Sequence, residues 1–341
     1  MYFKTPLAVF ISFISFAHAS VICSVIPEKS NAKILNEIYK IDSSLNVAPV
    51  PMDVVHIEHS LPGQPNVIKA YQAYDQFKIM RDSALLWQKT KDNKYLFFSK
   101  KYLLAWIDAY RPSLNPIDET PFDSLIVTYQ IIKSELDAGE KLKIDNFFNE
   151  WAHKYIKYIY AKRESEKGLV PNNWQSHRIK IITMLSTATG NKQLFLEARE
   201  IFKLQVLENI KSNGEVYDFT ERDALSYAVF DLLPLTQAAL VARSWGDNWY
   251  DFKSPSGSSL RKGVDWLVPY MDGDKTHEEF VNTKSEFDRV RRSIGMKDFK
   301  GNFKPQRAAP LFWVAASIDD KYSYIAEKLN PDPVPAIVIC D

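Results

Sequence analysis

Apolar residues recur at helical spacing along most of the chain, from about residue 65 to about residue 329. Breakers such as the residue pairs at 111–112, 190–191 and 213–214 separate the periodic segments. An alternating strand pattern is missing, apart from a short apolar run at 336–339. The pattern predicts a short helix near 31–39 and longer ones at about 66–90, 95–110, 117–137, 144–163, 172–188, 192–211, 221–243, 257–270, 276–292, 307–317 and 320–329.

Several of these helices carry apolar residues around much of their circumference, as the segments 103–110 and 232–241 show. Helices that are apolar on two sides are packed on two sides. Many such helices with short connections indicate successive antiparallel hairpins, which close into a toroid or stack into a solenoid. Fixed-period repeats are missing. The pattern predicts an all-α fold.

The first residues have the organisation of a secretory signal peptide. Lys4 provides a positive charge, an apolar stretch follows at 7–16, and Ala17-His18-Ala19 is a cleavage signal. The apolar stretch is shorter than the roughly 20 residues that span a bilayer. We therefore expect a signal peptide at 1–19, an irregular segment at 20–64 and the helical domain at 65–341. A lipid anchor at Cys23 is the alternative, and either way the protein is exported to the periplasm or secreted.

Composition and net charge limit the kinds of ligand that the protein is expected to bind. Hydrophobic residues make up 46% and charged residues 25% of the chain, as in folded soluble proteins. The formal net charge of +1 falls to about zero once Lys4 is cleaved off, so a polyanionic ligand needs a local basic patch. We expect no nucleic acid partner. Cys23 and Cys340 lie near the two ends of the mature chain and are predicted to form a disulfide, with two free thiols as the alternative.

Signatures of metal, nucleotide and serine-hydrolase chemistry are missing, including His-Glu-x-x-His, the P-loop and Gly-x-Ser-x-Gly. Only 11 glycines argue against phosphate-cradling loops. We therefore expect no metal site and no cofactor.

Two helix beginnings carry candidate chemistry. At the first, Asn172 and Asn173 precede an apolar run, and His177 lies one turn beyond Asn173 on the same face. With Arg178 they could hold a carboxylate, or they are a capped helix with surface polar residues. At the second, Tyr227 opens a strongly apolar segment and is either catalytic or a packed core residue.

Around the second helix beginning, Asp218 is a candidate helix cap. Glu221, three residues later, would complete a box-like arrangement with it.

Residues 222–239, RDALSYAVFDLLPLTQAA, resemble the helix that carries the catalytic tyrosine in the alginate lyase family. The Asn172-Asn173 pair resembles the family's asparagine-asparagine-histidine motif. Weaker similarities lie at 115–120 and 277–281. The chain departs from the pattern at Trp174, where the family has histidine, and at Thr220, where it has arginine.

The resemblance implies an incomplete (α/α) toroid that cleaves an acidic polysaccharide such as alginate by β-elimination. Tyr227 would then be the catalytic acid and possible base, and His177 would share the base role. Asn173 and Arg222 would neutralise the uronate carboxylate.

Further residues are candidates for substrate binding. They are Asn172, Trp174, Arg178 and Trp245, with Lys180, Arg243, Arg261 and Lys262 as a possible basic rim.

Two other functions stay open. A glycoside hydrolase on a helical toroid would need two carboxyl groups, for which the acids near the motifs are Glu119, Asp218, Glu221 and Asp223. A non-catalytic polysaccharide-binding protein would need the aromatic residues but not a tyrosine beside a histidine. For the lyase we expect an acidic polysaccharide as partner, a monomer, and no membrane contact after signal cleavage.

Overall fold

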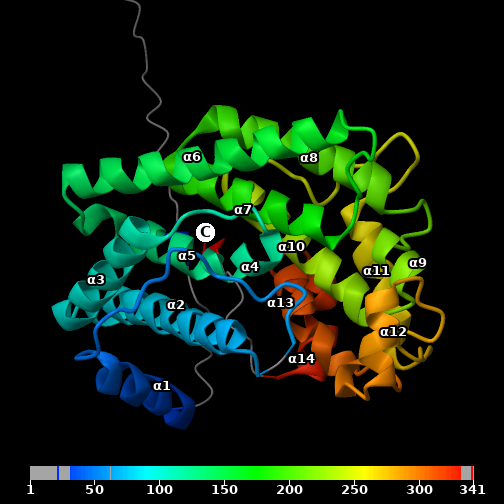
Figure 1. Ribbon diagram of the computed structural model, residues 1–341, viewed down its shortest axis with the longest axis horizontal. Coiled ribbons are helices and arrows are strands. Elements are labelled where there is room, and N and C mark those ends of the chain that lie inside the picture. The colour runs from blue at the N-terminus through cyan, green and yellow to red at the C-terminus, as the bar shows by residue number, and fades with distance from the viewer. Residues whose placement is uncertain (1–20, 23–30, 62, 332–338, 341) are drawn as a thin grey trace, which may run out of the picture.

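The computed structural model describes residues 21–22, 31–61, 63–331 and 339–340, and they form an all-α fold (Figure 1). Short 3₁₀ turns lie at Thr120–Phe122, Lys133–Glu135, Lys297–Phe299, Pro305–Ala308 and Asp320–Tyr322. The helices are α1 (Asn31–Ser44), α2 (Pro65–Thr90), α3 (Asn93–Ala109), α4 (Pro116–Glu119), α5 (Asp123–Ile132), α6 (Ala138–Arg163), α7 (Asn173–Thr189), α8 (Lys192–Asn209), α9 (Tyr217–Arg222), α10 (Leu225–Ser244), α11 (Leu260–Asp272), α12 (Glu286–Ser293), α13 (Ala309–Ile318) and α14 (Ser323–Leu329).

Local sequence explains where many helices begin. Pro65 stands at the first position of α2, where a missing N–H is tolerated. Asp92 caps α3 by accepting from the N–H of Lys94, and Asp137 forms a capping box with Glu140 at the start of α6. These short polar side chains satisfy N–H groups that the first helical turn leaves free.

The helices form an incomplete toroid of antiparallel hairpins. The helices α5, α7, α10 and α13 contact one another in that order and make an inner row. Outside them pack α3, α6, α8, α11 and α14, and Figure 1 shows α6 and α8 lying across α7. In α7 every residue except Trp174 and Thr189 is buried, which explains why this segment is apolar on more than one side.

Among the described helices, α10 alone is long and apolar enough to cross a membrane, with a mean hydropathy of 1.4. The same window is 78% buried within the fold. Its composition therefore reflects a central position in the inner row, between α7 and α13.

Three predicted helices differ from the structure. The segment at 117–137 divides into α4, α5 and two 3₁₀ turns, and the segment at 221–243 breaks at Asp223, whose φ of 48° is left-handed. The segment at 276–292 is helical only from Glu286 onward. The reason is tertiary: residues 277–284 hydrogen-bond to the junction between α9 and α10 instead of to themselves.

The segment before α2 is fixed to the helical core. Ile41 and Val55 are buried in the same apolar cluster as the inner helices. The carboxylate of Asp118 accepts the backbone N–H groups of Ile57 and Glu58 at 2.8 and 2.9 Å. The segment before α2 is therefore well packed, although its sequence has no regular apolar pattern.

The two ends of the described chain meet in a short antiparallel pair of strands, β1 (Val21–Ile22) and β2 (Ile339–Cys340). The predicted signal peptide and Cys23 lie outside the described residues. The disulfide between Cys23 and Cys340 therefore stays a prediction.

Candidate active site

The start of α7 is built by its two asparagines. The side chain of Asn172 accepts the N–H of Trp174 at 3.1 Å and caps the helix, as predicted. The buried Asn173 donates its backbone N–H and its Nδ2 to the carboxylate of Asp218, at 2.5 and 2.9 Å. The Nδ2 of Asn173 has no further hydrogen-bond partner among the described residues.

Asp218 does not cap its own helix, contrary to the prediction from sequence. The N-cap of α9 is Val216, which offers no side-chain cap, and Asp218 points its carboxylate to α7 instead. Burial raises the pKa of Asp218 to about 6, against the opposing effects of its bonds to Asn173 and of the Arg222 charge. The Asp218 carboxylate fixes the orientation of the Asn173 amide.

The imidazole of His177 lies one turn along α7. Its Nδ1 is 2.7 Å from Oγ1 of Thr120, which also accepts from Nζ of Lys180 at 2.8 Å. Its buried Nε2 has no partner within the described residues. Burial, together with the Lys180 charge, holds the pKa of His177 well below its usual value, so the ring is neutral at neutral pH.

Tyr227 lies in the first turn of α10 and is half-buried, and its hydroxyl has no hydrogen-bond partner in the described parts of the chain. The guanidinium of Arg222 lies 3.9 Å over its ring. Burial raises the pKa of Tyr227, and the charges of Arg222 and Arg291 partly oppose this. The phenol is therefore protonated at neutral pH and ready to donate.

Phe230 brings the two motifs together. Its ring centre is 4.4 Å from that of His177 and 6.3 Å from that of Tyr227. The phenol and the imidazole, which come from α10 and α7, therefore flank one aromatic side chain. Neither lies in a remote part of the fold.

A buried polar network holds these helix ends in place. Asp231 accepts from Ser176 and, at 2.6 Å, from Nδ2 of Asn209, while Gln205 donates to Ser176 at 3.1 Å. The side chain of Asn209 also accepts the N–H of Tyr217 at 3.1 Å. The network joins α7, α8, α9 and α10, and such satisfied networks favour one arrangement of the helices.

The segment that follows α11 completes the site from the other side. Glu279 is buried, and its carboxylate accepts the N–H groups of Leu225 and Ser226 at 2.7 and 3.2 Å. It thereby caps α10, whose own N-cap residue is Ala224. His277 bonds through Nε2 to the carbonyl oxygen of Asp223 at 3.0 Å. The weak sequence similarity at 277–281 thus marks residues that position Tyr227.

The sequence is also similar to that of a known protein family. The sequence profile described as Alginate lyase matches residues 36–277, which is more than half of the chain. The chain belongs to the alginate lyase family. This confirms the resemblance seen in the two helix motifs and identifies the chain as a polysaccharide lyase.

Solved structures with the same fold include an alginate lyase from Bacteroides ovatus, with 14% identity, coverage of 89% of this chain and 90% of that chain, and a TM-score of 0.65. Alginate lyase A1-III from Sphingomonas species A1 shares 18% identity, with coverage of 83% and 79% and a TM-score of 0.57. A variant of A1-III complexed with a tetrasaccharide has 16% identity, coverage of 81% and 78% and a TM-score of 0.58. No curated protein sequence matches the chain. The TM-scores establish a shared toroid fold despite the low sequence identities.

Arg222 of this lyase is committed to an ion pair. Its Nε and Nη2 both bond to the carboxylate of Asp288, which is fully buried and also accepts from Thr283. A guanidinium held at two positions is a rigid support for the Tyr227 ring. Its predicted role in neutralising a substrate carboxylate rests on the remaining Nη1 alone.

Two predicted binding residues are not placed to meet a sugar at Tyr227. Arg178 is buried, with its guanidinium 4.8 Å over the ring of Tyr158 and 5.7 Å from that of Trp174. Trp245 caps the far end of α10, roughly 27 Å from Tyr227 at 1.5 Å per helical residue. The half-exposed Trp174 alone keeps a position beside the asparagine pair.

The four residues of the predicted basic rim are separated in the structure. Lys180 is buried beside His177, where it donates to Thr120 and pairs with Asp123 at 2.9 Å. Arg243 binds backbone carbonyl oxygens at 317 and 318, and Lys262 binds those at 212 and 257. Arg261 pairs with Asp251. All four cations are therefore bound to groups of the protein itself.

The acids that a hydrolase would need are all engaged. Glu119 is buried and accepts from Tyr110, Trp151, Tyr155 and the backbone of Ser113. The others bind partners as follows: Asp218 binds Asn173, Glu221 binds Lys284, and Asp223 binds Asn282. The described residues also contain no group of three or more His, Cys, Asp or Glu side chains able to hold a metal.

Sequence reasoning missed Arg291. On α12, Arg289 pairs with Glu286, and Arg292 pairs with Glu278. Arg291 has no acidic partner among the described residues; its guanidinium lies 3.8 Å over Phe287 and 4.9 Å from the ring of Phe299. Spacing alone offers no signal, because nothing in the sequence distinguishes Arg291 from the two other arginines of α12.

Proposed function

We propose that this polysaccharide lyase cleaves a polyuronate such as alginate by β-elimination, with Tyr227 as the catalytic acid. A base removes the C5 proton, the electron pair forms the C4–C5 double bond, the C4–O bond breaks, and the leaving oxygen takes a proton. The observation that carries this assignment is the unpartnered hydroxyl of the half-buried Tyr227, whose ring shares Phe230 as a neighbour with the neutral imidazole of His177. A raised pKa keeps the phenol protonated, which suits a proton donor.

His177 is the proposed base. Its lowered pKa leaves the ring neutral, so a lone pair is present for the proton, although the ring contributes no positive charge against a carboxylate. For Nε2 to carry the free lone pair, Nδ1 must donate its proton to Oγ1 of Thr120, which lies 2.7 Å away. Thr120 is therefore the residue that selects the tautomer, in the same way as second-layer partners orient histidines elsewhere.

The substrate carboxylate must be neutralised before C5 becomes acidic enough. We propose that the free amide hydrogen of Asn173 and the guanidinium of Arg291 do this. Arg291 acts electrostatically on Tyr227 and has no carboxylate partner among the described residues, whereas Arg222 is held by Asp288. Alginate lyase A1-III accommodates a tetrasaccharide on the same fold, which supports an oligosaccharide ligand here.

The test is the ultraviolet absorbance of purified protein mixed with a panel of acidic polysaccharides. Elimination creates a conjugated enoate that absorbs, while hydrolysis and simple binding create none. Absorbance that grows with mannuronate or guluronate polymers is the expected result. Reducing ends that appear without absorbance would instead establish a hydrolase.

We further propose export with cleavage after Ala19 and a disulfide between Cys23 and Cys340. N-terminal sequencing of the protein from the culture medium or periplasm should then begin at Ser20. Alkylation before and after reduction should label the two cysteines only after reduction. Labelling without reduction would contradict the disulfide.

A further inference from the structure

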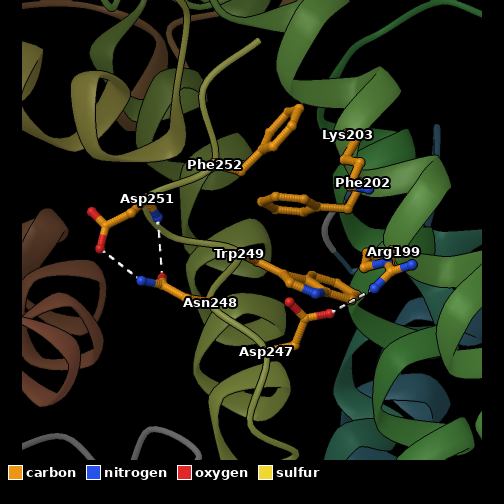
Figure 2. A pocket seen from close by; sticks show the side chains of 8 residues that line it. All are labelled: Arg199, Phe202, Lys203, Asp247, Asn248, Trp249, Asp251 and Phe252. Carbon is orange, nitrogen blue, oxygen red and sulfur yellow. Dashed lines mark hydrogen bonds and ion pairs between the residues drawn. The ribbon is translucent and has the colours of Figure 1, made fainter.

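A pocket of about 220 Å³ lies between the middle of α8 and the segment that follows α10 (Figure 2). It belongs to the end of α10 where Trp245 lies, and none of the catalytic candidates lines it. The ring of Trp245 contacts Phe195 at 5.0 Å, and Phe195 in turn packs on Trp249 in the pocket wall.

The floor of the pocket is aromatic. Phe202 and Trp249 are buried with ring centres 4.8 Å apart, and Phe252 is half-buried at the mouth. The indole N–H of Trp249 is buried and has no partner among the described residues. An unsatisfied buried donor destabilises the folded protein. A ligand with an acceptor oxygen would restore the missing hydrogen bond.

The two walls differ in charge. Figure 2 shows Arg199 and Lys203 on the α8 side, and Asp247 and Asn248 on the opposite segment. Arg199 and Asp247 are 3.5 Å apart, a long separation for an ion pair. Lys203 pairs at 2.9 Å with Glu200 on the helix surface. Exposed pairs of this kind contribute little to stability, so a ligand carboxylate can replace them.

Aromatic faces with a few convergent polar groups are typical of small-ligand pockets. A uronate ring fits this one: its C–H face would lie on the half-buried ring of Phe252, its carboxylate against Arg199 and Lys203, and its hydroxyls against Asp247 and Asn248. We propose that the pocket is a second, non-catalytic subsite for the acidic polysaccharide. The identity of the ligand rests on the proposed function, while the existence of the site does not.

A second subsite has a physical use on a polymer. Once one part of the chain is held at the pocket, another part reaches the catalytic site at a raised effective concentration. A polymer long enough to occupy both sites therefore binds the catalytic site more tightly, whereas a short oligomer that occupies one site at a time does not.

The experiment is calorimetric titration of a mannuronate tetramer into the Tyr227→Phe protein, which keeps the ligand intact if the proposed function holds. We expect two binding events. Lys203→Ala and Phe252→Ala, each added to this protein, should weaken one event at least tenfold and leave the other unchanged. Lys253→Ala, an exposed lysine that does not line the pocket, is the matched control and should leave both events as they are.

The outcomes separate this subsite from the proposed function. A single event that neither pocket substitution alters would overturn the subsite, and equal affinity for cellotetraose would overturn its preference for uronates. Enoate absorbance in the titration cell would instead contradict the Tyr227 assignment. Circular dichroism of each variant establishes that a lost event is not lost folding.

Discussion

At the scale of single residues, two tyrosines differ in what their hydroxyls do. The hydroxyl of Tyr227 has no partner within the described chain, while that of Tyr110 donates to Glu119 at 2.7 Å. We expect Tyr227→Phe to lower kcat by about 10²–10⁴, the usual contribution of a general acid. Its free energy of unfolding should hardly change, because no hydrogen bond is lost. Enoate absorbance and urea unfolding measure the two quantities.

Tyr110→Phe is the matched control. It removes one donor from the buried Glu119 carboxylate and should cost about 1–3 kcal/mol of stability without entering the reaction. Full activity in folded Tyr227→Phe would refute the acid role. A large loss of stability in that variant would instead identify Tyr227 as a packing residue.

The second comparison concerns the arginines of α12. Arg291→Gln should lower kcat by about 10²–10³, the effect of removing one group that stabilises developing charge. Arg289→Gln removes an exposed surface pair with Glu286 and should leave kcat within about twofold. The expected pattern is measured by initial rates at saturating polymer. Equal rates for the two variants would remove Arg291 from the mechanism.

Asp218 should set the acidic limb of activity. With its pKa raised to about 6, it is a carboxylate above that pH and accepts both N–H groups of Asn173; below it the protonated group holds them less well. We expect kcat to rise with pH through about 6 and Asp218→Asn to lack this step. The His177 step lies lower, because burial depresses its pKa.

The Asp218 carboxyl should change the free energy of unfolding in the opposite direction to kcat as the pH rises. A carboxyl whose pKa is higher in the folded than in the unfolded protein stabilises the fold at low pH, and this contribution is lost as pH rises through about 6. Wild type should therefore lose stability relative to Asp218→Asn between about pH 4 and pH 6. Urea unfolding at these pH values tests it, and parallel curves would contradict the assignment.

Residues of the site were predictable where one local motif carries them. The asparagine pair with His177, and the segment around Tyr227, are such cases. Thr120 ends the weakly similar segment 115–120, but its contact with His177 was not predictable, nor was that of Asp288 with Arg222. The partners lie 57 and 66 positions apart in the sequence. A contact of this kind leaves no periodicity or spacing in the sequence.

At the scale of helices, the start of α10 depends on a distant cap. Its N-cap residue is Ala224, and the cap comes from Glu279, 54 positions away. Sequence reasoning therefore joined α9 and α10 into one helix, although Asp223 is left-handed between them. Local sequence does not reveal a break whose stabilising groups come from another segment.

Glu279→Ala should accordingly cost about 1–2 kcal/mol, the usual range for a lost cap. It should also lower kcat, because Tyr227 lies in the helical turn that loses its cap. Glu278→Ala is the control: among the described residues its half-exposed side chain pairs only with Arg292, and we expect a change below about 0.5 kcal/mol. Equal stabilities in urea unfolding would show that Glu279 caps nothing.

At the scale of the whole molecule, the all-α class and most helix bounds follow from sequence, because apolar periodicity and breakers are local. The choice between toroid and solenoid did not follow from them. It depends on how α5, α7, α10 and α13 contact one another, and those contacts join distant segments. Only the family resemblance supplied that information before the structure did.

The segment before α2 should contribute to the stability of the whole fold, because its residues belong to the core although its sequence has no regular pattern. Val55 is fully buried and Val54 is 47% exposed, so neighbours of identical chemistry occupy opposite environments. Val55→Ala should lower the free energy of unfolding by about 2 kcal/mol, through lost apolar burial and the cavity left behind. Val54→Ala should change it by less than about 0.5 kcal/mol.

Both variants should unfold in one transition by fluorescence and by circular dichroism, because residues 53–58 hydrogen-bond to Arg111 and Asp118 of the helical part. Equal stability of the two variants would mean that the segment lies on the surface of the helices and does not contribute to their core. A separate early transition would mean that it docks as an independent unit. A single shared transition, lowered only by Val55→Ala, would show that the toroid and this segment fold together.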